Sequence, residues 1–301
     1  MNMMSTPPRR SLIERADDVY DFVAVLAPRS HGAAPAAPTP PATPIVQRAA
    51  LATAFATPAD GLGHVDIARL RDEGFIVPDA PPNALAEEFR LVKRHLLLRS
   101  VQNAEASPKD RMVLICSAQP NEGKTFCAVN LALSLASERD TEVLLVDADV
   151  AKPEVLSTLG LEGSAGLLDA LADPSLDVER LIIRTDVAKL SVLPAGRAIN
   201  DDTELLSSAR AAEVIAGLAA SNPRRIVIID TAPALAASAA SVLAHNVGRI
   251  LMVVRADRTT ESELRDAIAL LDGCRDIALL LNGTSFFGTN RTFGSYYGQD
   301  K

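Results

Sequence analysis

The feature that most limits the possible folds of this 301-residue chain is a series of short aliphatic runs that begins at Met112. The runs are residues 112–117, 142–147, 190–194, 225–230, 249–254 and 277–282. Each run is continuous rather than alternating, which is typical of strands that are covered on both faces. The segments between them, such as 125–138 and 203–221, are long enough for crossover helices. The pattern predicts an α/β fold with a doubly wound, mainly parallel sheet flanked by helices, and a ligand site at the carboxyl ends of the strands.

The rest of the chain divides by composition. We expect a helical segment in residues 1–26, an Ala/Pro-rich linker in 27–64, a domain in 65–285 and a tail in 286–301. Residues 11–26 have the apolar spacing and capping residues of one amphipathic helix, whereas the prolines after them predict a flexible linker. Within the domain, residues 65–79 predict a short docking element and 83–100 a longer helix. The Gly- and Ser-containing tail is expected to be mobile.

A phosphate-binding loop follows the first aliphatic run. Residues 112–117 lead into a segment that ends Gly123-Lys124-Thr125 and then into a helix. In this strand–loop–helix context the backbone N–H groups and the helix dipole hold phosphates, Lys124 reaches the β and γ oxygens, and the Thr125 hydroxyl coordinates Mg²⁺. The candidate cofactor-binding residues here are Ala118, Pro120, Asn121, Glu122, Gly123, Lys124, Thr125 and Phe126.

One position of this loop departs from the usual P-loop pattern. Ala118 occupies the place of the first glycine of GxxxxGK[ST]. Asn121 lies at the tip of the loop, and asparagine adopts left-handed dihedral angles more readily than most residues. A P-loop conformation is therefore still expected, although an ordinary strand–turn–helix with a chance Gly-Lys-Thr is the alternative.

Aspartates end two of the predicted strands. Asp147 ends the run at 142–147 and is expected next to the P-loop in any doubly wound order, and Asp149 follows it two residues later. Asp230 ends the run at 225–230 in the manner of a Walker B strand. A strand-end aspartate taken alone is often a helix N-cap, but three of them beside a P-loop predict a site for ATP and Mg²⁺. Thr125 with Asp149, Asp230 or both is expected to hold the metal. Lys124 and the three aspartates are the candidate catalytic residues, with Asp147 as the base and Asp149 as an alternative.

Charge and hydropathy exclude several other classes of protein. The net charge of −8 argues against nucleic acid as a partner. The basic N-terminus is not followed by an apolar stretch, so a secretory signal is not expected. The longest apolar runs are too short for a membrane span. The sequence therefore predicts a cytoplasmic protein without direct membrane insertion, whose contact with a membrane would go through a partner.

The motifs together resemble the bacterial tyrosine kinases of capsule and exopolysaccharide synthesis, and most closely the exosortase-associated tyrosine autokinases. The family's P-loop reads like SAxPxEGK[ST], as do residues 117–125. Its second motif, LLVDADxxxP, is matched by residues 144–153, and its DTPP motif by Asp-Thr-Ala-Pro at 230–233. The resemblance implies that Asn282 lies near the adenine. Lys152 is expected to help orient the phosphates or the loop that carries Asp147 and Asp149, although the family more often has arginine near there.

The resemblance also implies an activity and partners. The family transfers the γ-phosphate of ATP to C-terminal tyrosines of a neighbouring subunit, for which Tyr296 and Tyr297 are the candidates here. Its subunits join into a ring through a Glu-x-x-Arg-x-x-Arg helix face, matched by Glu87, Arg90 and Lys93. A membrane polysaccharide co-polymerase is the implied activator. The plainer interpretations are a solvated helix face and a tail whose tyrosines have no function.

Two other functions remain open from the sequence. One is a P-loop ATPase switch of the partitioning or division-site type. That group carries an extra lysine near the start of the loop, where this chain has Gln119. The other is a nucleotide-dependent regulatory subunit of a polysaccharide co-polymerase without kinase activity, which the complete set of candidate catalytic residues disfavours.

Overall fold

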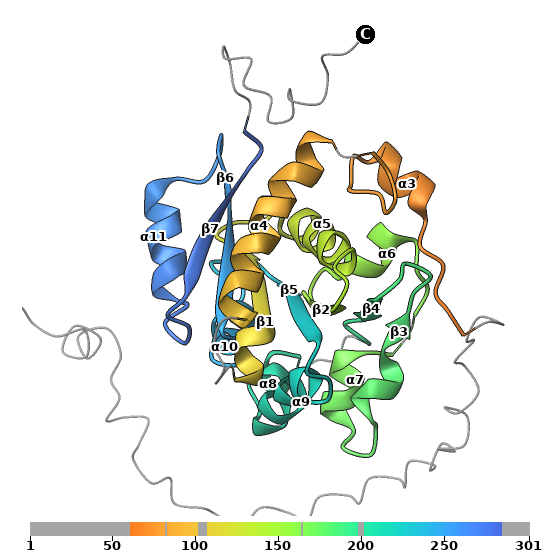
Figure 1. The fold of residues 1–301 in the computed structure, drawn as a ribbon. Helices are drawn as coiled ribbons and strands as arrows, with labels where there is room; N and C mark the ends of the chain where they lie inside the picture. The colour runs from red at the N-terminus through yellow and green to blue at the C-terminus, as the bar shows by residue number, and fades with distance from the viewer. Residues whose placement is uncertain (1–60, 82, 102–106, 164, 198–201, 285–301) are drawn as a thin grey trace, which may run out of the picture. The chain divides into compact units, whose positions relative to one another are not determined.

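The computed structural model describes residues 61–81, 83–101, 107–163, 165–197 and 202–284 (Figure 1). All of them belong to one compact unit, Ala52–Lys301. The helix expected at 11–26, most of the linker, and the tail with Tyr296 and Tyr297 lie outside the described residues.

The aliphatic runs all form strands of one sheet. The strands are β1 (Met112–Ser117), β2 (Glu142–Ala148), β3 (Ile183–Arg184), β4 (Leu190–Leu193), β5 (Arg225–Thr231), β6 (Arg249–Arg255) and β7 (Ile277–Asn282). Their order is β3-β4-β2-β5-β1-β6-β7. All neighbouring strands pair in parallel except β3, which is antiparallel to β4. The prediction of a mainly parallel sheet is confirmed, while the two-residue β3 was not predicted because it is too short to leave an apolar run.

Helices connect the strands as crossovers, and two further helices of the described residues precede the first strand. They are α3 (Ile67–Asp72), α4 (Ala84–Val101), α5 (Lys124–Ala136), α6 (Val155–Leu159), α7 (Leu167–Ala172), α8 (Asp202–Leu206), α9 (Ala209–Ala220), α10 (Ala239–Ala244) and α11 (Glu261–Ala269). Short 3-10 turns cover Pro108–Arg111 and Val178–Leu181. The segment 203–221, which was expected to be long enough for crossover helices, contains two, α8 and α9. Ser208 stands between α8 and α9 and caps the second helix, since its Oγ accepts a hydrogen bond from Ala211 N at 3.1 Å.

Two apolar layers cover the sheet, one on each face. Successive strand residues point to opposite faces, so Leu114 and Leu144 belong to one layer, and Ile115 and Leu145 to the other. The first layer is closed by α7, α8, α9, α10 and α11, the second by α3, α4, α5 and α6 (Figure 1). Helices on both faces confirm the doubly wound fold.

The edge strand β7 differs from the expectation of full cover. Ala278 and Leu280 pack, half-buried, on the layer of α4 and α5. The alternate residues Leu279 and Leu281 are 56% and 58% exposed. The apolar run 277–282 predicted cover on both faces, but β7 is the last strand of the sheet. On its second face Ile277 packs, half-buried, against the layer of α11, while Leu279 and Leu281 stay exposed.

The folded part of the domain begins before the predicted boundary. Gly63, assigned from the sequence to the linker, donates its N–H to Arg184 O at 2.7 Å and forms a bridge with Thr185. The following segment buries Val65 and Leu70 in the core. Residues 65–79 therefore dock as predicted, with the sheet contact starting at Gly63.

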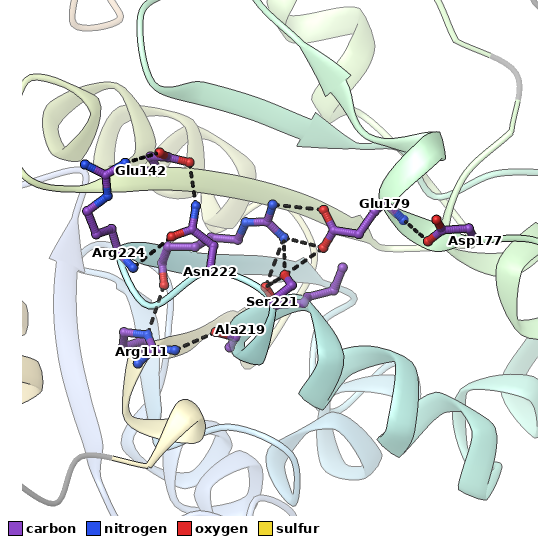
Figure 2. Close-up of polar contacts among 10 residues, drawn as sticks. Arg111, Glu142, Asp177, Glu179, Ala219, Ser221, Asn222 and Arg224 are labelled. Atoms are coloured by element: carbon purple, nitrogen blue, oxygen red, sulfur yellow. Dashed lines mark hydrogen bonds and ion pairs between the residues drawn. The ribbon is translucent and has the colours of Figure 1, made fainter.

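A polar network fixes the amino ends of β2 and β5 (Figure 2). Arg225 makes a two-pronged contact with Glu179, at 2.6 and 2.9 Å, which lowers the pKa of that carboxyl. Glu142 accepts a hydrogen bond from Asn222 at 2.7 Å, and Arg111 donates to the carbonyl of Arg225 at 3.3 Å. These contacts hold the end of the sheet opposite to the carboxyl ends of the strands, where the candidate site lies.

Candidate active site

The loop between β1 and α5 has the conformation of a P-loop. Asn121 has φ +64° and Gly123 has φ +93°, both in the left-handed region. The prediction for Asn121 is confirmed. Gly123 is the N-cap of α5, and a Cβ there would collide with the side-chain amide of Asn282. Glycine is required at this position by the backbone conformation and by this close approach.

The P-loop residues reach the predicted aspartates. Lys124 Nζ lies 2.8 Å from Asp149 Oδ2, and both side chains are buried. The Thr125 hydroxyl donates to Asp230 Oδ2 at 2.6 Å. Asp147 and Asp230 are direct partners across β2 and β5. The four residues and Thr125 therefore form one cluster at the carboxyl ends of β1, β5 and β2.

The strand order corrects one detail of the expected geometry. From the sequence, Asp147 was expected next to the P-loop in any doubly wound order. The structure inserts β5 between β1 and β2. Asp230 is consequently the aspartate on the strand beside β1, and it is Asp149, two residues beyond Asp147, that reaches Lys124.

Asp147 is held by backbone groups and is shifted toward neutrality. Its Oδ1 accepts from Asp149 N at 3.2 Å and its Oδ2 accepts from Val155 N at 3.1 Å. Burial raises the pKa of Asp147 to about 7, although these two hydrogen bonds oppose the shift. A carboxylate with a pKa near neutrality can take up a proton at neutral pH.

Asp230 provides the test of whether the site suits Mg²⁺. It is fully buried, and burial raises its pKa to about 7 in the absence of a metal. Within the described residues its Oδ1 has no hydrogen-bond partner, whereas Oδ2 accepts from Thr125. A buried carboxylate oxygen without a partner next to a threonine hydroxyl fits a Mg²⁺ ligand set completed by phosphate oxygens and water. In the same part of the chain no three His, Cys, Asp or Glu side chains gather as an all-protein metal cage.

A cavity of about 420 Å³ opens beside Asp147. Its walls combine apolar side chains with the polar Ser157 and Glu162, and they come from the segment around α6 and from the loop after β4. The lining includes Asp147, Pro153, Leu156, Leu161, Pro194 and Gly196. The cavity is large enough to take an aromatic side chain, and it places a titratable carboxylate in its wall.

Other predicted cofactor-binding residues take different places. Asn282 donates from Nδ2 to the carbonyl of Glu122 at 2.9 Å, so it lies against the P-loop, and its place near the adenine stays a prediction. Phe126 packs its ring on Phe75 at 4.8 Å, in the core rather than toward the crevice. Lys152 is exposed and pairs with Glu154 at 2.8 Å, so the structure does not bring its ammonium to the loop.

The expected oligomerisation face is reduced to two residues. Arg90 is exposed and pairs with Glu87 at 3.0 Å along α4. Lys93 departs from the expectation, because it is buried and binds within its own subunit. Its Nζ donates to Ser134 O at 2.9 Å and lies 2.7 Å from Glu138. An i, i+3 spacing spreads three residues over about a third of the helix circumference, so Lys93, the last of the three, faces the core and not the solvent.

Sequence reasoning missed two residues that contact the P-loop. Thr259 donates its hydroxyl to Glu122 Oε1, and Glu263 Oε1 accepts from Gln119 Nε2 at 3.1 Å. The local pattern around Glu263 indicates only a capping box with Thr260 at the start of α11, and the structure contains this capping box. No spacing rule connects Thr259 or Glu263 to a loop more than 130 residues earlier in the chain.

The strand–loop–helix, the buried Lys124–Asp149 and Thr125–Asp230 pairs, and the doubly wound sheet define the class of P-loop nucleotide-binding proteins. The family described as an AAA domain matches residues 111–264, slightly more than half of the chain.

Comparison with individual proteins narrows the class. Tyrosine-protein kinase YwqD of Bacillus subtilis is 30% identical over 220 residues, covering 72% of this chain and 88% of YwqD. The putative tyrosine-protein kinase EpsB of Ralstonia nicotianae is 33% identical over 195 residues, covering 65% of this chain and 24% of EpsB. The solved VpsO kinase domain is 30% identical, with a TM-score of 0.55, over 66% of this chain and 98% of that domain. The chain belongs to the bacterial tyrosine kinase family.

The chain covers very different shares of its relatives. The chain spans only about a quarter of the length of EpsB, although it spans most of YwqD. In the described residues no helix combines the length and the apolar character that a membrane crossing requires.

Proposed function

We propose that this chain is an ATP-dependent protein-tyrosine autokinase that regulates bacterial exopolysaccharide polymerisation or export. The observation that carries the proposal is the position of Asp147. This buried carboxylate, with a pKa near 7, belongs to the P-loop cluster and also lines a partly apolar cavity large enough for an aromatic acceptor. Hydrolysis of ATP by water would need no such cavity.

The residues of the cluster can divide the work of phosphoryl transfer, which depends mainly on position and on charge neutralisation. Lys124, which pairs with Asp149 in the structure, would exchange this partner for the phosphates of ATP. Thr125 and Asp230, with Asp149, would hold Mg²⁺, which supplies positive charge next to the transferred phosphate. Asp147 would accept the proton of the tyrosine hydroxyl, and it fits this role better than Asp149 because it lines the cavity.

The acceptors that we propose are Tyr296 and Tyr297 of a neighbouring copy. Three tyrosines occur in the chain, and these two lie in its last six residues. A ring of subunits joined through Glu87 and Arg90 on α4 would bring one tail to the next site, and the exposure of Arg90 supports this role.

The proposed setting rests on the family resemblance. The activator would be a membrane polysaccharide co-polymerase, with the kinase at the cytoplasmic face of the membrane through this partner. The absence of a lysine at position 119 argues against the ATPase-switch alternative. Gln119, at the position of the additional lysine of that group, is bound to Glu263 of its own subunit.

Mass spectrometry of the full chain after incubation with MgATP tests the proposal. Wild-type protein should gain phosphotyrosine at Tyr296 or Tyr297. Asp147→Asn should lower the rate by roughly 10²- to 10⁴-fold, the usual contribution of a general base, while still binding ATP. Turnover of ATP without phosphotyrosine would favour the ATPase switch instead.

A further inference from the structure

Glu122 is a buried carboxylate in a loop whose expected ligand is an anion. Its side chain has no exposure to solvent. A negative charge here would repel the phosphates of ATP if it faced them. Contact with the nucleotide is therefore a poor explanation for a carboxylate at this position.

The contacts of Glu122 suggest a different role. Its Oε2 accepts from Gln119 N at 2.9 Å, and its Oε1 accepts from the hydroxyl of Thr259. The Thr259 oxygen in turn accepts from Arg255 N at 2.8 Å. Both carboxylate oxygens are thus acceptors, as in an ionised carboxylate, and such charge-assisted hydrogen bonds are among the stronger ones in proteins.

Two additional contacts join the same elements. Gln119 Nε2 donates to Glu263 on α11, and Asn282 at the end of β7 donates to the carbonyl of Glu122. The P-loop is therefore tied to the segment between β6 and α11, to α11 itself and to the end of β7. Among these contacts, the one between Glu122 and Thr259 is the only one that joins a fully buried carboxylate to a hydroxyl.

We propose that Glu122 and Thr259 form a positioning pair, which holds the P-loop in its phosphate-binding shape by fastening it to the segment between β6 and α11. This inference rests on the proposed nucleotide site. Neither residue is proposed to touch the nucleotide, so the pair acts on the affinity for ATP through the conformation of the P-loop. The loop is ordered before ATP arrives, which lowers the cost of ordering it upon binding.

The test measures nucleotide affinity apart from catalysis. The full chain is titrated with a fluorescent, non-hydrolysable ATP analogue and Mg²⁺, and KM for ATP and kcat are measured for phosphotyrosine formation. Thr259→Val removes the hydroxyl at nearly constant volume and leaves a buried carboxylate oxygen without its partner. We expect Kd and KM to rise about tenfold, with kcat at saturating ATP changed by less than about twofold.

Conservative and control variants sharpen the result. Thr259→Ser keeps the hydroxyl and should restore Kd. Thr203→Val makes the same chemical change on the exposed surface of α8 and should leave Kd at the wild-type value. Glu122→Gln keeps the shape but loses the charge, so it should weaken binding a few-fold, and it serves as the test if Thr259→Val does not fold.

Several outcomes would overturn the proposal. A Kd for Thr259→Val within twofold of wild type would show that the pair does not position the loop. Equal weakening in Thr259→Ser would show that the hydroxyl is not the cause. Tighter binding by Glu122→Gln would show that the carboxylate only repels the phosphates. Wild-type protein that does not bind the analogue would instead refute the proposed nucleotide site.

Discussion

Asp147 and Asp230 are neighbours across β2 and β5, and both are buried where a charged carboxylate is costly. Burial raises the pKa of Asp230 from 3.8 to about 7. Because the folded-state pKa lies above the unfolded value, the protonated carboxyl stabilises the folded state. This contribution is fully present below pH 3.8 and is lost as the pH rises through about 7. The site is thus least stable at the pH where it would hold Mg²⁺ and ATP.

Asp230→Asn should remove this pH dependence in the protein without nucleotide. The asparagine oxygen can still accept from Thr125, and no charge has to be buried. The free energy of unfolding of the variant, relative to wild type, should therefore increase between pH 5 and pH 8 by up to a few kcal/mol. Urea denaturation across this pH range measures it, and a difference that does not change with pH would contradict the shift.

Because Lys124 pairs with Asp149, Lys124→Met is expected to change the stability of the protein as well as its activity. Lys124→Met should reduce phosphotyrosine by at least about 100-fold, but it also leaves the buried Asp149 without its partner. We expect it to lower the free energy of unfolding by about 3 kcal/mol. Adding Asp149→Asn should recover most of this loss. Equal stability of wild type and Lys124→Met would show that the pair does not persist in solution.

At the scale of elements, α4 presents different residues on its two sides. Lys93 fastens α4 to the end of α5, the helix that begins at Lys124 of the P-loop. Glu87 and Arg90 lie nearer to the solvent. A contact made by α4 with another subunit would thus be made by an element that is fixed to the P-loop helix.

Substitutions on the two sides of α4 should separate stability from assembly. Lys93→Met keeps the side-chain stem but loses the contacts to Ser134 and Glu138, so thermal unfolding should show a loss of about 1–2 kcal/mol. Glu87→Ala with Arg90→Ala should leave stability within about 0.5 kcal/mol and should lower the mass measured by light scattering. An unchanged mass would remove this face from the interface.

The elements could be predicted from the sequence where the signal is local. Every aliphatic run became a strand, and the helix at 83–100 is α4, because continuous apolar runs and helical periodicity record burial directly. The break at Ser208 between α8 and α9 could not be located from the sequence, because a serine inside an apolar helical pattern can equally face solvent. The exposure of Leu279 and Leu281 depends on β7 being the edge strand, and the order of strands in a sheet cannot be predicted from the residues of one apolar run.

At the scale of the whole molecule, the sequence predicted the site but not its supports. The P-loop and the three aspartates could be identified because each lies at a recognisable strand end, and the parallel sheet brings those ends together. The partners of the P-loop, Thr259 and Glu263, could not, since they come from a distant segment and have ordinary local roles. The inward turn of Lys93 likewise depends on how α4 packs on α5.

A mixing experiment tests most directly whether one copy of the chain phosphorylates the tail of another copy. The acceptor carries Lys124→Met with Asp149→Asn, so that it is folded but inactive. The donor keeps its active site and carries Tyr296→Phe with Tyr297→Phe. After incubation with MgATP, mass spectrometry should find phosphotyrosine at Tyr296 or Tyr297 of the acceptor, and none when either protein is incubated alone. An acceptor that stays unmodified beside a donor shown to bind ATP would contradict the account.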